Sequence, residues 1–193
     1  MESGGDSLFP LIDHDKVSCL NEQTVGSAKT ILRALDDKNK PLGCVISNEG
    51  DPELIIQVPF TAGVKIRSVC VAGEAGLRHP TKVHLFVNRD DIDFENGHEV
   101  KPTQTLALNE DPDGELDYPL KTSKFGSVHT LTLFFVEGAG GDDEEVRINF
   151  LGFKGVNMKH KRAVVEAVYE SRPMAQDTRA RGDEHAASMS GLT

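Results

Sequence analysis

The chain has 193 residues, a usual length for one domain, and 38% of them are apolar. Lys and Arg number 21 against 31 Asp and Glu, and the resulting net charge of −10 argues against non-specific binding to nucleic acid or to an anionic membrane surface. Because the chain has no CxxC pair, no signal peptide pattern and no apolar run of about 20 residues, we expect a cytoplasmic or nuclear protein.

The first 50 residues carry weak structural signals. Residues 1–10 include Gly, Ser and Pro, and we expect them to form a flexible N-terminus. Ser27 to Leu35 places Ile31, Leu32 and Leu35 at helical spacing, which predicts one short helix.

Strand patterns then follow one another closely. In each, apolar residues alternate with polar ones, which is typical of a strand with one buried face. Val128 to Val136 is apolar or Thr on both faces and predicts a central strand covered on both sides. Gly, Pro, Asn and Asp separate the strands, so the sequence predicts an all-β antiparallel sandwich or jelly roll. The predicted strands are Glu53–Val58, Val64–Ala72, Lys82–Asn88, Thr103–Leu108, Val128–Val136 and Glu145–Phe150.

The three cysteines differ in their predicted surroundings. Val64, Ile66 and Cys70 share one face of a predicted strand, so we expect Cys70 to be a buried, inert thiol. Cys19 and Cys44 fall in segments that we expect to be loops.

The charge changes sign after the last predicted strand. Lys154 to Glu170 is locally +2 and also contains apolar residues, which predicts a contact surface for a protein partner. The alternative is that this segment packs on its own acidic domain, and the sequence leaves both open. The candidate partner-binding residues are Lys154, Lys159, Lys161, Arg162 and Tyr169.

The sequence contains no recognisable catalytic or metal-binding pattern. The seven histidines include no HExxH pair, and we expect His84 and His129 to be ordinary strand residues. Three acidic runs could attract Ca²⁺ but lack the spacing of an EF-hand, so we expect solvated loops. They lie within residues 90–95, 111–115 and 142–145.

Five segments, taken in order, carry a resemblance to a known family, and Cys19-Leu20-Asn21-Glu22 is the core of the first. They are Leu11–Glu22, Ser47–Glu74, Pro80–Phe94, Gln104–Phe125 and Val146–Gly155. Together they resemble the PITH domain, which occurs at the C-terminus of a thioredoxin-like protein and in stand-alone PITH domain-containing proteins, and the resemblance spans about residues 11–172.

This resemblance implies a jelly-roll β-sandwich similar to galactose-binding-like domains. It also implies association with the proteasome regulatory particle, on which the thioredoxin-like relative docks through this domain. The lack of CxxC means that disulfide reductase activity is not carried over. We therefore expect a PITH domain over residues 11–172, a disordered tail over residues 173–193, and a monomer without enzymatic activity or cofactor. The alternative function is binding of a carbohydrate or other small ligand, by analogy with sandwiches of this architecture.

Overall fold

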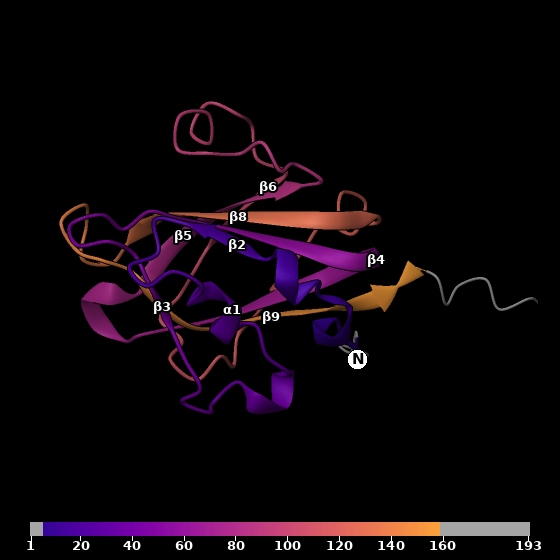
Figure 1. Ribbon diagram of the computed structural model, residues 1–193, viewed down its shortest axis with the longest axis horizontal. Coiled ribbons are helices and arrows are strands. Elements are labelled where there is room, and N and C mark those ends of the chain that lie inside the picture. Colours follow the sequence, from indigo (N-terminus) through magenta and orange to yellow (C-terminus); the bar gives the residue numbers. More distant parts are fainter. Residues whose placement is uncertain (1–5, 159–193) are drawn as a thin grey trace, which may run out of the picture. The chain divides into compact units, whose positions relative to one another are not determined.

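Antiparallel β-strands dominate the computed structural model, which describes residues 6–158 (Figure 1). The strands are β1 (Asp6–Ser7), β2 (Ser18–Leu20), β3 (Val45–Ile46), β4 (Leu54–Gly73), β5 (Pro80–Val87), β6 (Gln104–Ala107), β7 (Asp117–Pro119), β8 (Val128–Gly138) and β9 (Arg147–Asn157). The helical elements are α1 (Ala28–Ile31) and four short 3-10 turns, η1 (Phe9–Leu11), η2 (His14–Lys16), η3 (Leu35–Asp37) and η4 (Gly76–Arg78).

The long strand β4 connects the two layers of the sandwich. Its first part, Leu54–Pro59, pairs with β8, and its second part, Val64–Gly73, pairs with β9. The register shifts between these parts, beside a proline that has no N–H to donate. The hydrogen-bonded order is β1-β9-β4-β8-β5-β6, with β2 and β7 on β4 and β3 on β9. In Figure 1, β8 and β9 accordingly lie on opposite sides of β4.

The main core lies between these layers, and smaller clusters lie on their outer faces. Leu54, Ile56 and Val58 point into the main core, as the alternation predicts. Ile55 points the other way and packs with Phe134 and two other buried residues under the connection between β5 and β6. This confirms that the strand starting at Val128 is central and covered on both sides.

One β-bulge changes which residues of β4 face the main core. Ile66 pairs with Gly155 and Ser68 with Lys154, so β4 has one more residue than β9 at this point. The alternation is therefore inverted beyond the bulge, and Cys70 packs on the outer face with Phe150. The prediction that Cys70 shares a face with Val64 and Ile66 is wrong. Its predicted burial is confirmed, with 2% of the residue exposed.

The N-terminal segment also differs from the expectation. The helix is limited to Ala28–Ile31, because Leu32 is extended and forms a parallel bridge with Leu151 of β9. Residues 6–10 are not a flexible extension, since β1 pairs with β9 and Leu8 is buried in the main core.

Candidate interaction surface

The structure places Lys154 inside the sheet. Strand β9 continues to Asn157, so Lys154 lies within the last strand and not after it, which corrects the predicted end of that strand at Phe150. Its ammonium group forms an ion pair with Asp117 of β7, and its side chain is 26% exposed. Lys154 therefore connects two strands of one layer. The other candidate partner-binding residues, Lys159, Lys161, Arg162 and Tyr169, lie outside the described residues.

A groove of about 300 Å³ lies where β9 ends. Asp6, Ser7, Leu8 and Leu11 line one side of it, and the last residues of β9 line the other. Met158 follows directly and is 38% exposed. The surface at the end of the described residues therefore has both apolar and polar groups.

A second groove, here called the Lys38 groove, has a volume of about 330 Å³. Three cationic side chains line it, against one carboxylate, on a chain whose net charge is −10. The ten lining residues are Lys38, Asn39, Lys40, Pro41, Gly43, Cys44, Pro112, Asp113, Arg147 and Asn149. No sequence pattern predicts this groove, because its walls come from three segments that only the fold brings together.

The buried guanidinium of Arg33 holds the walls of the Lys38 groove in place. It donates hydrogen bonds to the carbonyl oxygens of Asn149 at 2.9 Å, Lys40 at 3.2 Å and Lys38 at 3.4 Å. It also donates to Thr30 at 2.9 Å and lies over the Phe150 ring. Burial lowers the pKa of Arg33, an effect partly opposed by the carboxylate of Asp37. One charged side chain thus fixes the 38–44 segment against β9.

The polar residues of the first PITH-like segment stabilise loops. Asn21 has a positive φ of 72°, which Asn tolerates better than most residues, and its amide donates to Asp51 and to the Glu53 carbonyl. The Glu22 carboxylate accepts hydrogen bonds from the backbone N–H groups of Gly26 and Ala28 at the start of α1. Asn21 and Glu22 therefore have structural partners within the fold.

Acidic side chains in two of the predicted acidic runs also stabilise loops, by accepting hydrogen bonds from backbone N–H groups. Asp111 is buried and accepts hydrogen bonds from the N–H groups of Glu115 and Leu116. Asp93 accepts from Glu95 and Asn96 in the same way. Among residues 6–158, no group of three or more His, Cys, Asp or Glu side chains is arranged to hold a metal ion.

All three cysteines are free thiols in different environments. Cys19 lies in β2 rather than in the predicted loop, and burial, together with nearby Glu22, raises its pKa. The Cys70 thiol donates to the Gly114 carbonyl, and burial raises its pKa to about 11. Cys44 is partly exposed and lines the Lys38 groove.

Three of the histidines, His84, His98 and His129, lie in strands or contact neighbouring residues of the fold. His84 and His129 lie in β5 and β8, as predicted, and His84 contacts the Thr105 hydroxyl. His98 pairs with Glu53 at 2.7 Å and packs against the Phe134 ring, which attaches the connection between β5 and β6 to the sheet. Within the described part of the chain, no helix has the length and apolar character needed to span a membrane.

Most of the chain is similar in sequence to known proteins. Residues 1–173 match the family model of the PITH domain. A PITH domain-containing protein of Drosophila pseudoobscura is 35% identical over 172 residues, covering 89% of this chain and 80% of the relative. PITH domain-containing protein 1 of Dictyostelium discoideum is 36% identical and covers 89% and 83%. The Homo sapiens protein of the same name is 30% identical and covers 77% and 68%.

Solved structures show the same architecture at low sequence identity. The CBM32-5 domain of Clostridium perfringens GH89, in complex with GalNAc-β-1,3-galactose, has a TM-score of 0.51 and 18% identity, covering 78% of this chain and all of that domain. The C-terminal domain of a Bacteroides fragilis chitobiase has a TM-score of 0.52 and 18% identity, covering 74% and 93%. The predicted galactose-binding-like β-sandwich is therefore confirmed, and at this identity the likeness concerns the fold alone.

Proposed function

The chain belongs to the PITH domain family, and on that premise we propose that it is a non-catalytic interaction module that associates with the proteasome regulatory particle. The observation that carries the proposal is the family match over residues 1–173, together with the docking role that the PITH resemblance implies. The change of charge supports it, since a chain of −10 contains a stretch of +2 from Lys154 to Glu170.

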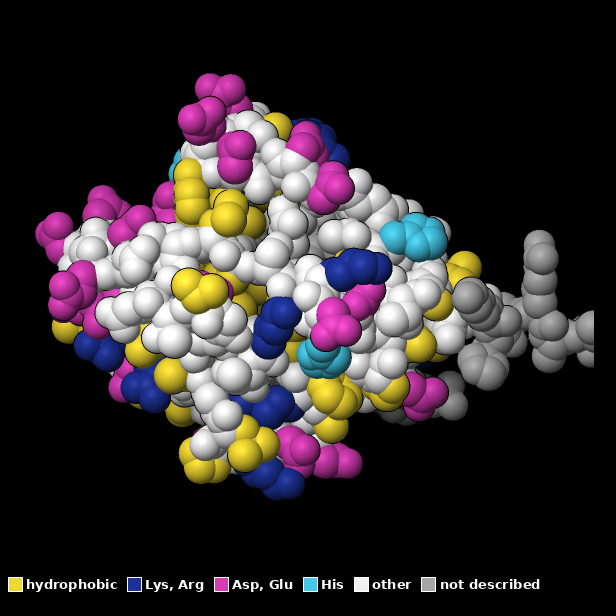
Figure 2. All heavy atoms as spheres, viewed as in Figure 1, with side chains coloured by type: hydrophobic (Ala, Val, Ile, Leu, Met, Phe, Trp, Pro, Cys, Tyr) yellow, Lys and Arg dark blue, Asp and Glu magenta, His cyan; other side chains and the backbone are white. Residues whose placement is uncertain are grey.

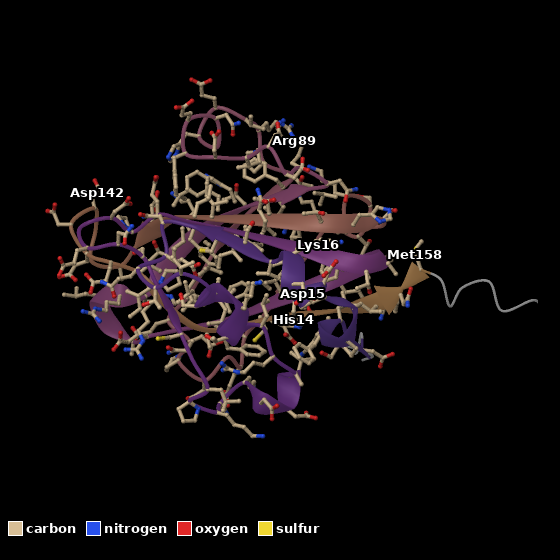
Figure 3. The ribbon with its side chains drawn as sticks, in the orientation of Figure 1. His14, Asp15, Lys16, Arg89, Asp142 and Met158 are labelled. Carbon is tan, nitrogen blue, oxygen red and sulfur yellow. The ribbon has the colours of Figure 1, made fainter. Side chains whose placement is uncertain are left out.

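The contact residues that we propose are Lys154, Lys159, Lys161, Arg162 and Tyr169. Lys154 is already paired with Asp117, so its charge contributes less to a partner than the cations that follow it. Figure 3 shows Met158, after which the basic segment begins, far from Asp142 in the acidic connection between β8 and β9.

The test is a charge reversal of the basic segment. The variant carries Lys159→Glu, Lys161→Glu and Arg162→Glu, and its binding to purified proteasome regulatory particle is measured beside its melting temperature. We expect binding to be lost while the melting temperature stays nearly unchanged, because the lost interactions are with the partner.

A matched control separates specific contact from total charge. Lys101, Lys121 and Lys124 are exposed on the sandwich, and reversing all three changes the net charge by the same amount. The control should bind like the wild type. A sharp fall in the melting temperature of the first variant, with binding retained by its folded fraction, would show that the segment is structural and would overturn the site assignment.

We also place the protein in the cytoplasm or nucleus, as a monomer. The thiols support a reducing compartment, because Cys19, Cys44 and Cys70 are all free. Fractionation of cells that express the tagged chain tests the location, and sedimentation tests the oligomeric state.

Carbohydrate binding is a second candidate, suggested by the solved domain in complex with GalNAc-β-1,3-galactose. Sugar sites commonly use exposed aromatic rings, but the chain has no Trp, and the Tyr118 hydroxyl is held by the N–H of Asn109 at 2.9 Å. Tyr118 is also 9% exposed. Calorimetric titration with galactose and N-acetylgalactosamine tests this candidate, and measurable binding would favour it over the first.

A further inference from the structure

We propose that Asn96 is a site of spontaneous deamidation, and that opening of the connection between β5 and β6 controls when it reacts. Asn96 is the one asparagine of the chain that a glycine follows. The residue after an asparagine supplies the backbone nitrogen that attacks the side-chain amide, and a glycine there leaves the approach free of a Cβ. The inference does not depend on the proposed function, and it concerns residues 88–103, between Val87 of β5 and Gln104 of β6.

The packing of the connection requires glycine at residue 97. A Cβ added to Gly97 would lie 2.7 Å from a ring carbon of Phe134 and 2.7 Å from the carbonyl oxygen of Asp93. The neighbouring His98 packs its ring against the Phe134 ring, with 4.9 Å between the ring centroids, so the backbone stays close to β8 here. Any larger residue would displace these groups, and the fold therefore requires the reactive Asn-Gly sequence.

The Asn96 amide closes the connection on itself and is protected while it does so. Its Nδ2 donates to the Asp91 carbonyl at 2.7 Å, and its Oδ1 accepts from the N–H of Asp93 at 3.2 Å. The N–H of Gly97, whose nitrogen is the nucleophile of the reaction, donates to the Asp93 carbonyl at 2.8 Å. Because these hydrogen bonds hold both the nucleophile and the amide that it attacks, the connection has to open locally before Asn96 reacts.

The reaction itself needs only water and a base. The Gly97 nitrogen loses its proton to the base and forms a bond to Cγ of Asn96, while the bond from Cγ to Nδ2 breaks and Nδ2 leaves as ammonia with the proton returned. The product is a cyclic imide. Water then adds to one imide carbonyl and breaks the bond between that carbon and the ring nitrogen, which takes up a proton. Opening at Cγ gives Asp, opening at the backbone carbonyl gives isoaspartate, and nothing is oxidised or reduced.

The product destabilises the closed connection. A carboxylate at residue 96 has no N–H to donate at neutral pH, so an oxygen would face the Asp91 carbonyl where Nδ2 now donates. The new negative charge also adds to an acidic segment, and Figure 2 shows Asp and Glu side chains at the top of the view, where this connection lies in Figure 1. The carboxylates already on the connection are Asp90, Asp91, Asp93, Glu95 and Glu99.

Opening of the connection uncovers an apolar part of the sheet. Ile92 is 2% exposed and belongs to one buried cluster with Ile55, Phe86 and Phe134, which lie on β4, β5 and β8. Release of Ile92 would bring these side chains into contact with water. Deamidation therefore changes the outer face of the sheet from a covered surface to an apolar one.

The experiment follows deamidation of the full chain in a mildly alkaline buffer, with the modified residue identified by peptide mapping and mass spectrometry. The folded chain should deamidate at Asn96 at least about tenfold more slowly than the same chain in urea, because opening precedes the attack. Ile92→Ala should speed the reaction of the folded chain about tenfold, since it removes the apolar anchor of the connection. The matched control Ile12→Ala removes an equally buried isoleucine of the main core and should leave the rate within about twofold of the wild type.

A milder variant keeps the test decisive if Ile92→Ala does not fold. Glu53→Ala removes the carboxylate that lies 2.7 Å from the His98 ring nitrogen, and it should also speed deamidation of Asn96. Equal rates in the folded chain and in urea, equal acceleration by Ile12→Ala, or no reaction of Asn96 in any folded variant would each overturn the proposal.

Hydrogen–deuterium exchange measures the effect of the product. Asn96→Asp introduces the carboxylate directly and should speed exchange of the amides of residues 88–103 about tenfold. Asn109→Asp adds the same charge at an exposed residue outside the connection and should leave that exchange unchanged. Unchanged exchange in Asn96→Asp would show that the amide does not hold the connection closed and would overturn the proposed effect of deamidation.

Discussion

Replacing Arg33 with Met should destabilise the fold by about 2 kcal/mol. The two shorter hydrogen bonds, to the Thr30 and Asn149 carbonyls, are both 2.9 Å, and bonds from a charged donor contribute about 1.5–3 kcal/mol each. Part of this is offset, because Met at a residue that is 8% exposed no longer requires burial of a charge. The carbonyls of Lys38 and Lys40 lie beside the groove, where water can replace the guanidinium.

The assay is urea denaturation followed by circular dichroism. For a chain of this length, the expected loss corresponds to a fall in melting temperature of about 4–8 °C. The control is Arg89→Met, since Arg89 makes a two-point ion pair with Asp91 at 2.6 and 2.7 Å but is 43% exposed. We expect the control to lower the free energy of unfolding much less than Arg33→Met does, because water and salt screen an exposed ion pair. Equal losses in the two variants would refute the reasoning that burial makes the Arg33 contacts important.

Three further predictions concern the sandwich itself. Gly155→Ala should lower the free energy of unfolding, measured by urea denaturation, by about 1–3 kcal/mol, because the added Cβ would overlap a backbone oxygen of β4. The control Gly126→Ala should leave it nearly unchanged, and similar losses in the two variants would contradict this. Asn88→Ala should lower the free energy of unfolding by about 2 kcal/mol in the same assay, since Asn88 has a φ of 54° and its amide oxygen accepts hydrogen bonds from two N–H groups of β8. A loss near zero would refute this prediction. Maleimide should label Cys70 more slowly than Cys44. The rate of Cys70 labelling should rise about tenfold per pH unit up to about pH 11, because burial raises the thiol pKa to about 11 and leaves little thiolate below that pH. A rate that reaches a plateau near pH 8 would contradict the burial of this thiol.

The strands could be predicted because their signal is local. Alternation within Lys82–Asn88 or Glu145–Phe150 needs no knowledge of the partner strand. The continuity of β4 could not be predicted, since Pro59 and Gly63 look like a turn between two strands. The bulge beside Ile66 depends on how β9 pairs with β4 at this point, and no local sequence pattern indicates it.

The candidate sites were less accessible to sequence reasoning for a physical reason. The cations from Lys159 to Arg162 are close together in the sequence and could be recognised there, but their role stays a prediction. The Lys38 groove depends on Arg33 holding a segment against β9, and Asn149 is 116 residues from Arg33. Contacts at that separation follow from the sheet topology and not from spacing along the chain.

The most direct test of the central claim is a titration of the intact chain against purified proteasome regulatory particle. Immobilised chain should bind the particle saturably, and the Lys159/Lys161/Arg162 charge reversal should abolish that binding while the Lys101/Lys121/Lys124 reversal leaves it intact. Failure of the folded wild-type chain to bind the particle at any concentration tested would contradict the proposed function.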